Sequence, residues 1–149
     1  MRPAIAWALA LMAWGCQAGP PPPSALDTRN DACAECRMAV SNARFAAQIV
    51  APGEEPLFFD DLGCLAAYLS SQAQRAPRAA AYVADHRTGD WVPAASAVFT
   101  KVPVLDTPMG SHVVAHASAA SRDADPDARG GSALDVRAFF TRPLPDGMR

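Results

Sequence analysis

The chain has 149 residues, half of them hydrophobic, and a formal net charge of -2, which suits one or two small folded units. Its 13 basic residues are scattered and nearly balanced by 15 acidic ones. No patch can therefore neutralise a run of phosphates, and the composition argues against nucleic-acid binding.

The first fifteen residues have the pattern of an export signal. A short charged start is followed by an apolar stretch from Ala4 to Trp14, which is too short to remain as a membrane span. Small residues then precede Cys16, as at a bacterial lipoprotein processing site, although the usual Leu is missing at the third position before the cysteine. We expect residues 1–15 to be a lipoprotein signal peptide and Cys16 to be lipidated. A plainly secreted protein and an uncleaved anchor are the alternatives.

Residues 16–30 are predicted to be a linker. The run Gly19-Pro20-Pro21-Pro22-Pro23-Ser24 is stiff and extended in character, which would hold a domain off a membrane. Gln17 stands where an Asp often retains lipoproteins at the inner membrane, so the outer membrane is favoured. Export also favours disulfides, but Cys16 aside, three cysteines remain, and an odd number is not typical of a disulfide framework.

Three sulfur donors lie close together in Cys33-Ala34-Glu35-Cys36-Arg37-Met38. A C-x-x-C pair can be half of a zinc site, a redox couple or a soft-metal site. Zinc needs four ligands, whereas Cys64 stands alone and no histidine adjoins another cysteine. A thioredoxin-type couple precedes a long helix, which is not evident here. Thiolates with a thioether select Cu(I), although Met is also a common core gap-filler.

The next segments predict a β-β-α-β unit. Pro52-Gly53 is a strong turn signal between two strands, and Asp60-Asp61 supplies an N-cap for a helix that should stop before Pro77. The apolar face of that helix carries Leu62, Leu65 and Leu69 at helical spacing. The predicted elements are a strand at 44–51, a strand at 55–60, a helix from Leu62 and a strand at 79–85.

The second half of the chain weakly repeats this pattern, with expected strands at 96–104, 112–117 and 132–136 and a helix from about Ser118. The stretch Arg122 to Asp127 is acidic and broken by Pro126, which weakens the predicted helix. We expect an α+β fold of two small β-β-α-β-like units, at 31–87 and 88–142, followed by a tail at 143–149.

Further candidate ligands lie outside the sulfur cluster. Cys64 falls in the first turn of its predicted helix, where the dipole would lower the thiol pKa, although a small buried cysteine is equally ordinary. Met109 lies in a turn-like loop three residues before His112, whose imidazole suits copper. His116 shares a strand face with His112 by period two, and both can equally be half-buried strand histidines. His86 is expected in a solvated loop.

No catalytic motif is evident. The sequence has no nucleophile elbow, no phosphate loop, no H-E-x-x-H and no pair of carboxylates set for acid-base work, so we predict no enzymatic activity. Asp60-Asp61 is best explained by capping and polar contacts, although a carboxylate near the cysteines can tune a metal site.

The motifs in their order resemble the NosL family, over about Ala32 to Phe139. The resemblance rests on the C-x-x-C-x-M cluster and on three further segments, which are Phe58-Phe59-Asp60-Asp61-Leu62-Gly63-Cys64-Leu65, Trp91 to Phe99, and Thr107-Pro108-Met109-Gly110-Ser111. It implies two similar small α+β units and a periplasm-facing, membrane-anchored Cu(I) metallochaperone. The implied recipient is nitrous oxide reductase or its maturation transporter complex, and related chains occur outside denitrification. The family motif commonly has Gly where this chain has Arg37, whose charge could stabilise the thiolates.

The sequence therefore predicts a lipid-anchored Cu(I)-binding protein that acts by ligand exchange. A low-coordinate Cu(I) can accept an incoming donor before it releases an old one. It would be held by two or three of the candidate ligands Cys33, Cys36, Met38, Cys64, Met109 and His112. The alternatives are an exported thiol-disulfide oxidoreductase that uses Cys33 and Cys36, and a lipoprotein of purely structural role.

Overall fold

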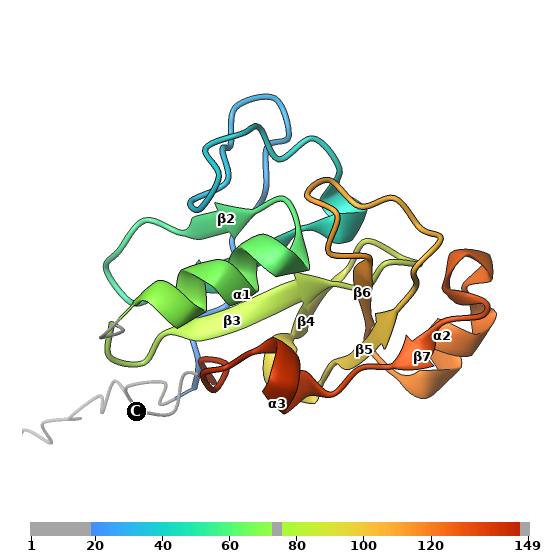
Figure 1. Ribbon diagram of the computed structural model, residues 1–149. Coiled ribbons are helices and arrows are strands. Elements are labelled where there is room, and N and C mark those ends of the chain that lie inside the picture. The colour runs from blue at the N-terminus through green and yellow to red at the C-terminus, as the bar shows by residue number, and fades with distance from the viewer. Residues whose placement is uncertain (1–18, 73–75, 147–149) are drawn as a thin grey trace, which may run out of the picture.

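The computed structural model describes residues 19–72 and 76–146 (Figure 1). The predicted signal peptide and Cys16 lie outside these residues. Within them, the chain forms two antiparallel sheets with short helices, which confirms the α+β prediction. None of the helices in this described part is long and apolar enough to cross a bilayer.

The first sheet has four strands in the order β2-β1-β3-β4. Gly53, at φ +77, makes the turn between its first two strands, a conformation that glycine adopts without a Cβ penalty. Both faces of the central strands are covered, because all residues of β1 and β3 are buried. The strands are β1 (Ala47–Val50), β2 (Leu57–Phe59), β3 (Ala80–Ala84) and β4 (Trp91–Pro93).

Helix α1 (Leu62–Ser71) lies across one face of this sheet (Figure 1). It begins where predicted, because the Asp61 side chain caps it by accepting a hydrogen bond from the Gly63 amide at 2.6 Å. Leu62, Leu65 and Leu69 are buried beneath it, as the helical spacing of the sequence requires.

The second sheet repeats the arrangement of the first. Its strands β5 (Val98–Lys101), β6 (Val113–His116) and β7 (Ser132–Ala133) have the order β6-β5-β7, which matches the β2-β1-β3 part of the first sheet. Helix α2 (Ala119–Ala124), capped by Ser118, follows the hairpin as α1 does. The β-β-α-β repeat is therefore confirmed, with a second helix of six residues.

Short helical turns complete the fold. The 3-10 turns η1 (Ala43–Phe45) and η2 (Ala94–Ser96) each precede the first strand of a sheet. The turn η3 (Pro126–Ala128) follows α2. Helix α3 (Val136–Phe139) begins at the last residue of the strand predicted at 132–136. That strand is thus two residues long rather than five.

The two sheets are directly joined at the end of β3. Asp85 and Ala115 form an isolated parallel bridge, and the His86 amide donates a hydrogen bond to the Ala115 carbonyl at 2.8 Å. A single hydrophobic cluster includes Phe59 and Leu65 from the first unit and Phe99 and Val113 from the second. The two units therefore share one core.

The Pro-rich segment forms no helix or strand in the part that the structure describes, and it is docked on the first sheet. Tyr82 Oη donates to the Pro21 carbonyl at 2.6 Å, and Gln48 and Ser24 exchange two hydrogen bonds at 2.8 and 3.1 Å. Strand β4 was not predicted, and it extends the first sheet to Pro93, beyond the expected unit boundary at residue 87.

Candidate metal centre

The cysteine loop is a tight turn fixed to the edge of the first sheet. The Cys33 amide donates to the Met38 carbonyl at 2.7 Å, and Ala32 and Ala39 pair as an isolated bridge. The Ala34 amide donates to the Phe58 carbonyl at 2.8 Å. These bonds hold Cys33 beside the end of β2. Asp60 and Asp61 follow β2 directly and precede the first residue of α1.

Arg37 occupies a left-handed conformation in this loop, at φ +66. Its amide donates to the Cys33 carbonyl at 3.0 Å and closes the turn. An L-residue with a Cβ is strained at such a φ, whereas glycine is not. The geometry therefore explains why a glycine suits this position of the motif, and it identifies Arg37 as a strained residue.

Three thiols and one carboxylate converge at the start of α1. One ligand atom from each of Cys33, Cys36, Asp60 and Cys64 lies within 4.8 Å of those of the other three. Cys33, Asp60 and Cys64 are buried and Cys36 is partly exposed. The Cys36 thiol donates to the Asp60 carboxylate, at 3.6 and 3.7 Å from its two oxygens. The cysteines are not in disulfides.

Burial favours the protonated form of the Cys33 and Cys64 thiols. Desolvation raises the pKa of the Cys33 thiol, although amide hydrogen bonds from Cys36, Asp60 and Glu35 act against it. Desolvation also raises the pKa of Cys64, and the hydrogen bond with Asp60 and the charge of Cys33 add to the effect. The expectation that the helix lowers the Cys64 pKa is therefore wrong. A metal that binds here must displace protons.

Asp61 fastens the loop between β5 and β6 onto the start of α1. Its Oδ2 accepts hydrogen bonds from Thr107 Oγ1 at 2.6 Å and from the Met109 amide at 3.0 Å. Burial alone would raise the pKa of Asp61, but the bonds from Ser111, Thr107, Gly63 and Met109 lower it. The capping and polar-contact interpretation of this carboxylate is confirmed, and the loop that carries Met109 lies against the helix of Cys64.

The remaining predicted ligands are Met38, in the cysteine loop, and Met109 and His112, in the loop between β5 and β6. Met38 and Met109 are 55% and 46% exposed, so neither thioether is enclosed by the fold. His112 precedes β6 with φ +54, so the expected alternation with His116 along one strand does not hold. Its Nδ1 lies 2.8 Å from the Leu105 carbonyl. Because that carbonyl only accepts, Nδ1 donates in this contact, which leaves Nε2 as the ring nitrogen that could ligate a metal.

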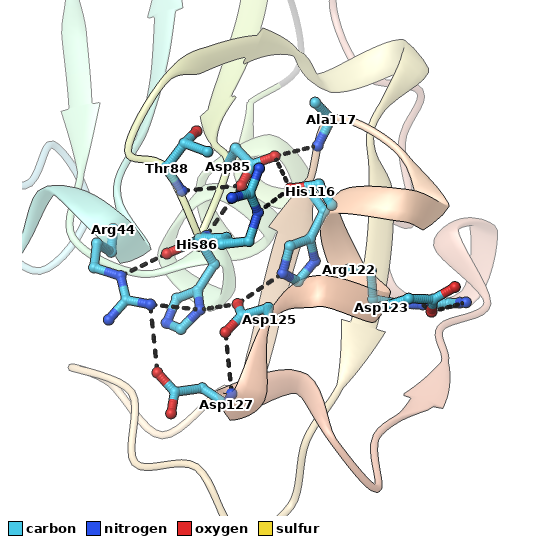
Figure 2. Close-up of polar contacts among 12 residues, drawn as sticks. Arg44, Asp85, His86, Thr88, His116, Ala117, Arg122, Asp123, Asp125 and Asp127 are labelled. Atoms are coloured by element: carbon cyan, nitrogen blue, oxygen red, sulfur yellow. Dashed lines mark hydrogen bonds and ion pairs between the residues drawn. The ribbon is translucent and has the colours of Figure 1, made fainter.

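The structure also reveals site residues that sequence reasoning missed. Asp60 was assigned to capping and polar contacts, or to tuning a metal site, and it joins the thiols as a donor of the cluster itself. His86, expected in a solvated loop, is completely buried, and so is His116, which was expected to be at most half-buried. Both ring systems contact Asp125 (Figure 2). No local sequence signal joins these three residues, because long-range strand pairing brings them together.

The cluster of Cys33, Cys36, Asp60 and Cys64 has the chemistry of a metal site. Three soft sulfur donors favour Cu(I), and they can hold it in low coordination. The carboxylate completes a set of four donors that is also suited to tetrahedral Zn²⁺. The earlier objection to zinc, that too few ligands are available, is therefore weaker in the structure than in the sequence.

Comparison with known families gives one result that bears on these residues. The family model of NosL matches residues 24–139, a range that contains all four residues of the cluster. No curated protein and no solved structure matches the chain.

Proposed function

Because the chain belongs to the NosL family, we propose that it is a Cu(I) metallochaperone whose cargo site is the cluster of Cys33, Cys36 and Cys64. The observation that carries this proposal is the convergence of three thiols from two separate segments within 4.8 Å, in a chain of that family. The chain would supply no catalytic turnover of its own.

Ligand exchange at this site would begin at Cys36. Cys33 and Cys64 are buried, whereas Cys36 is partly exposed, so an incoming sulfur or nitrogen donor can reach an ion on that side first. Cys36 also donates to Asp60, which gives its proton an acceptor when the thiol becomes a ligand. The exposed thioethers of Met38 and Met109 are weaker donors that would guide Cu(I) in or out.

The proposed recipient is nitrous oxide reductase or its maturation transporter complex. Delivery can be tested by mixing the Cu(I)-loaded chain with apo nitrous oxide reductase and measuring copper in each protein after separation. We expect copper to move to the reductase faster than chelator-bound Cu(I) does. Equal rates would contradict direct transfer, and the Cys36→Ser variant, which loses the accessible thiol, should transfer more slowly or fail to load.

Cys16 is the proposed lipid anchor of a periplasm-facing protein, with the outer membrane favoured. The docked Pro-rich segment supports an arrangement in which the domain stays close to the bilayer, since Pro21 and Ser24 are already bonded to the first sheet. Labelling of cells with a palmitate analogue should mark the wild-type chain and not Cys16→Ser. Equal labelling of both would contradict lipidation at this residue.

The Met38→Ala variant distinguishes the chaperone proposal from the alternative of a thiol-disulfide oxidoreductase. Under the chaperone proposal this change weakens Cu(I) binding, because a soft donor is lost, whereas the redox potential of Cys33 and Cys36 should stay nearly unchanged. Met148→Ala is a matched control, since it removes a thioether far along the chain. A Met38→Ala variant with unaltered Cu(I) affinity would remove Met38 from the site.

The Asp60→Asn variant distinguishes Zn²⁺ from Cu(I) as the cargo of the cluster. Zn²⁺ needs the carboxylate as its fourth ligand, so its affinity should fall by at least about 10-fold, which is the smallest loss typical of a disturbed coordination sphere. Cu(I) is satisfied by two or three sulfurs and should be retained. If Asp60→Asn lowers both affinities equally, the carboxylate acts through the thiols and the cargo must be identified by metal analysis of the isolated protein.

A further inference from the structure

A second group of metal-binding side chains lies where the two sheets meet, away from the cysteines in sequence. It consists of His86 from the loop after β3, His116 at the end of β6 and Asp125 between α2 and η3 (Figure 2). One donor atom from each lies within 4.8 Å of the other two. All three residues are at most 1% exposed.

The donor atoms are directed at one point. Asp125 Oδ2 lies 2.7 Å from His86 Nδ1 and 2.9 Å from His116 Nε2. In tetrahedral Zn²⁺ sites with bonds of about 2.0–2.1 Å, neighbouring donors are about 3.3 Å apart. Small side-chain rotations would therefore open the space between these three atoms to the size of one ion.

The cluster is costly as a purely structural feature. Two histidines and a carboxylate are buried together, and apolar side chains of similar size would fill the space without desolvating polar groups. Because the carboxylate only accepts, both histidines present N–H groups to Asp125, and a bound metal ion would replace these two protons. The opposite ring nitrogens, His86 Nε2 and His116 Nδ1, are buried without a hydrogen-bond partner among the described residues, so the fold does not use the full hydrogen-bonding capacity of the two rings.

The surroundings of the cluster would tolerate a cation. Arg44 Nη2 lies 3.4 Å from His86 Nδ1, but it is also paired with Asp127 Oδ2 at 3.3 Å, which balances its charge. The Arg44 side chain is 44% exposed, so an outward rotation would open a path to the histidines. The Arg44 Nε bond to the His86 carbonyl at 2.5 Å would break in that movement.

We propose that His86, His116 and Asp125 form a second, structural site for a borderline divalent cation, with Zn²⁺ as the probe of choice. Two imidazole nitrogens and one carboxylate oxygen suit Zn²⁺ and Cu²⁺ rather than Cu(I). The chain would thus separate its metals by donor chemistry, with sulfur for the cargo and nitrogen and oxygen for the structural ion. Because the ligands come from both sheets, the ion would tie the two units together.

The three histidines of the chain provide an internal control for the test. Zn²⁺ is added to the full-length chain in which Cys33, Cys36 and Cys64 are all serine, and the ring signals of His86, His112 and His116 are followed by NMR. We expect one equivalent of Zn²⁺ to shift the signals of His86 and His116 and to leave His112 unshifted. Because this variant lacks the three thiols, the result is independent of the proposed function. Unshifted His86 and His116 signals at a large excess of Zn²⁺ would overturn the proposal.

A variant extends the test to affinity. Asp125→Asn should weaken the Zn²⁺ binding that shifts His86 and His116 by at least about 100-fold, since even outer-sphere partners of a metal contribute 10–100-fold. Asp123→Asn is the matched control, since this carboxylate of α2 is exposed, and it should not change Zn²⁺ binding at the histidines. Survival of the shifts at unchanged Zn²⁺ concentration in Asp125→Asn would overturn the assignment. If Asp125→Asn does not fold, the NMR titration without it decides alone.

Discussion

Replacement of Asp61 by Ala should destabilise the domain and release the loop that carries Met109. The side chain is completely buried and makes three short contacts, to the Gly63 amide, the Thr107 hydroxyl and the Met109 amide. Loss of an N-cap costs about 1 kcal/mol. The stranded hydroxyl and amide add about 1–3 kcal/mol each, so we expect a total loss of about 3–7 kcal/mol in the free energy of unfolding.

The assay is urea unfolding of the reduced apo protein at pH 7, followed by circular dichroism. Thr107→Val is the matched variant, because it removes one donor and leaves the cap intact, and it should cost only about 1–2 kcal/mol. The double variant should cost less than the sum of the two, since the two side chains share a bond. A loss of 1 kcal/mol or less for Asp61→Ala would refute the role given to this carboxylate.

Three further predictions concern strain and protonation. Arg37→Gly should stabilise the protein by about 0.5–1 kcal/mol in urea unfolding, because relief of the left-handed strain outweighs the added flexibility of glycine; a destabilised variant would contradict the strain. Burial raises the pKa of Cys33 and Cys64, so these thiols must lose their protons when they bind Cu(I). As the pH is lowered, Cu(I) affinity should therefore fall about tenfold per pH unit for each such thiol. A Cu(I) affinity that does not change with pH in competition titrations would argue against thiolate ligation. Burial lowers the pKa of His86 below 6.5, although the hydrogen bond with Asp125 acts against this shift. For Asp125, burial alone would raise the pKa, but the hydrogen bonds from His116 and His86 outweigh it and lower the pKa to about 2. The unfolded chain then binds protons that the folded one does not, so stability should fall as pH drops below about 6.5, and equal urea midpoints at pH 7 and 5 would contradict this.

Local signals predicted the elements that depend on local chemistry. Asp61 marked the start of α1 and Gly53 the first hairpin, and both act as capping and turn rules require. The repeat was also visible in the sequence, because both halves follow a hairpin with a capped helix. Strand β4 was missed, since Trp91–Pro93 is short and ends in a proline, which only an edge strand tolerates.

The cysteines Cys33, Cys36 and Cys64 were named from the sequence and lie together in the structure, but their electrostatic environment was not predicted. Cys64 does lie in the first turn of a helix, yet its pKa is raised because the fold buries it beside Asp60 and Cys33. His86 lies among polar neighbours in the sequence and was assigned to solvent, whereas the bridge between Asp85 and Ala115 carries it into the interior. Such effects depend on contacts between distant segments, which residue spacing does not encode.

The same limit applies to the Pro-rich segment. Its composition predicted a chain without helix or strand, but docking depends on Gln48 and Tyr82 of the first sheet. The Pro-rich segment was expected to hold the domain off the membrane over its full length. Because Pro21 is hydrogen-bonded to the domain, only the residues before it can act as a spacer.

The central claim, that the cysteine cluster carries Cu(I), is tested most directly by anaerobic competition titration. The reduced chain from Gln17 to Arg149 is titrated with Cu(I) against a chelator of known affinity, beside a variant in which Cys33, Cys36 and Cys64 are all serine. We predict one equivalent of Cu(I) bound far more tightly than micromolar by the native chain and none retained by the variant. Binding no tighter than micromolar, or equal binding by the variant, would contradict the proposed function.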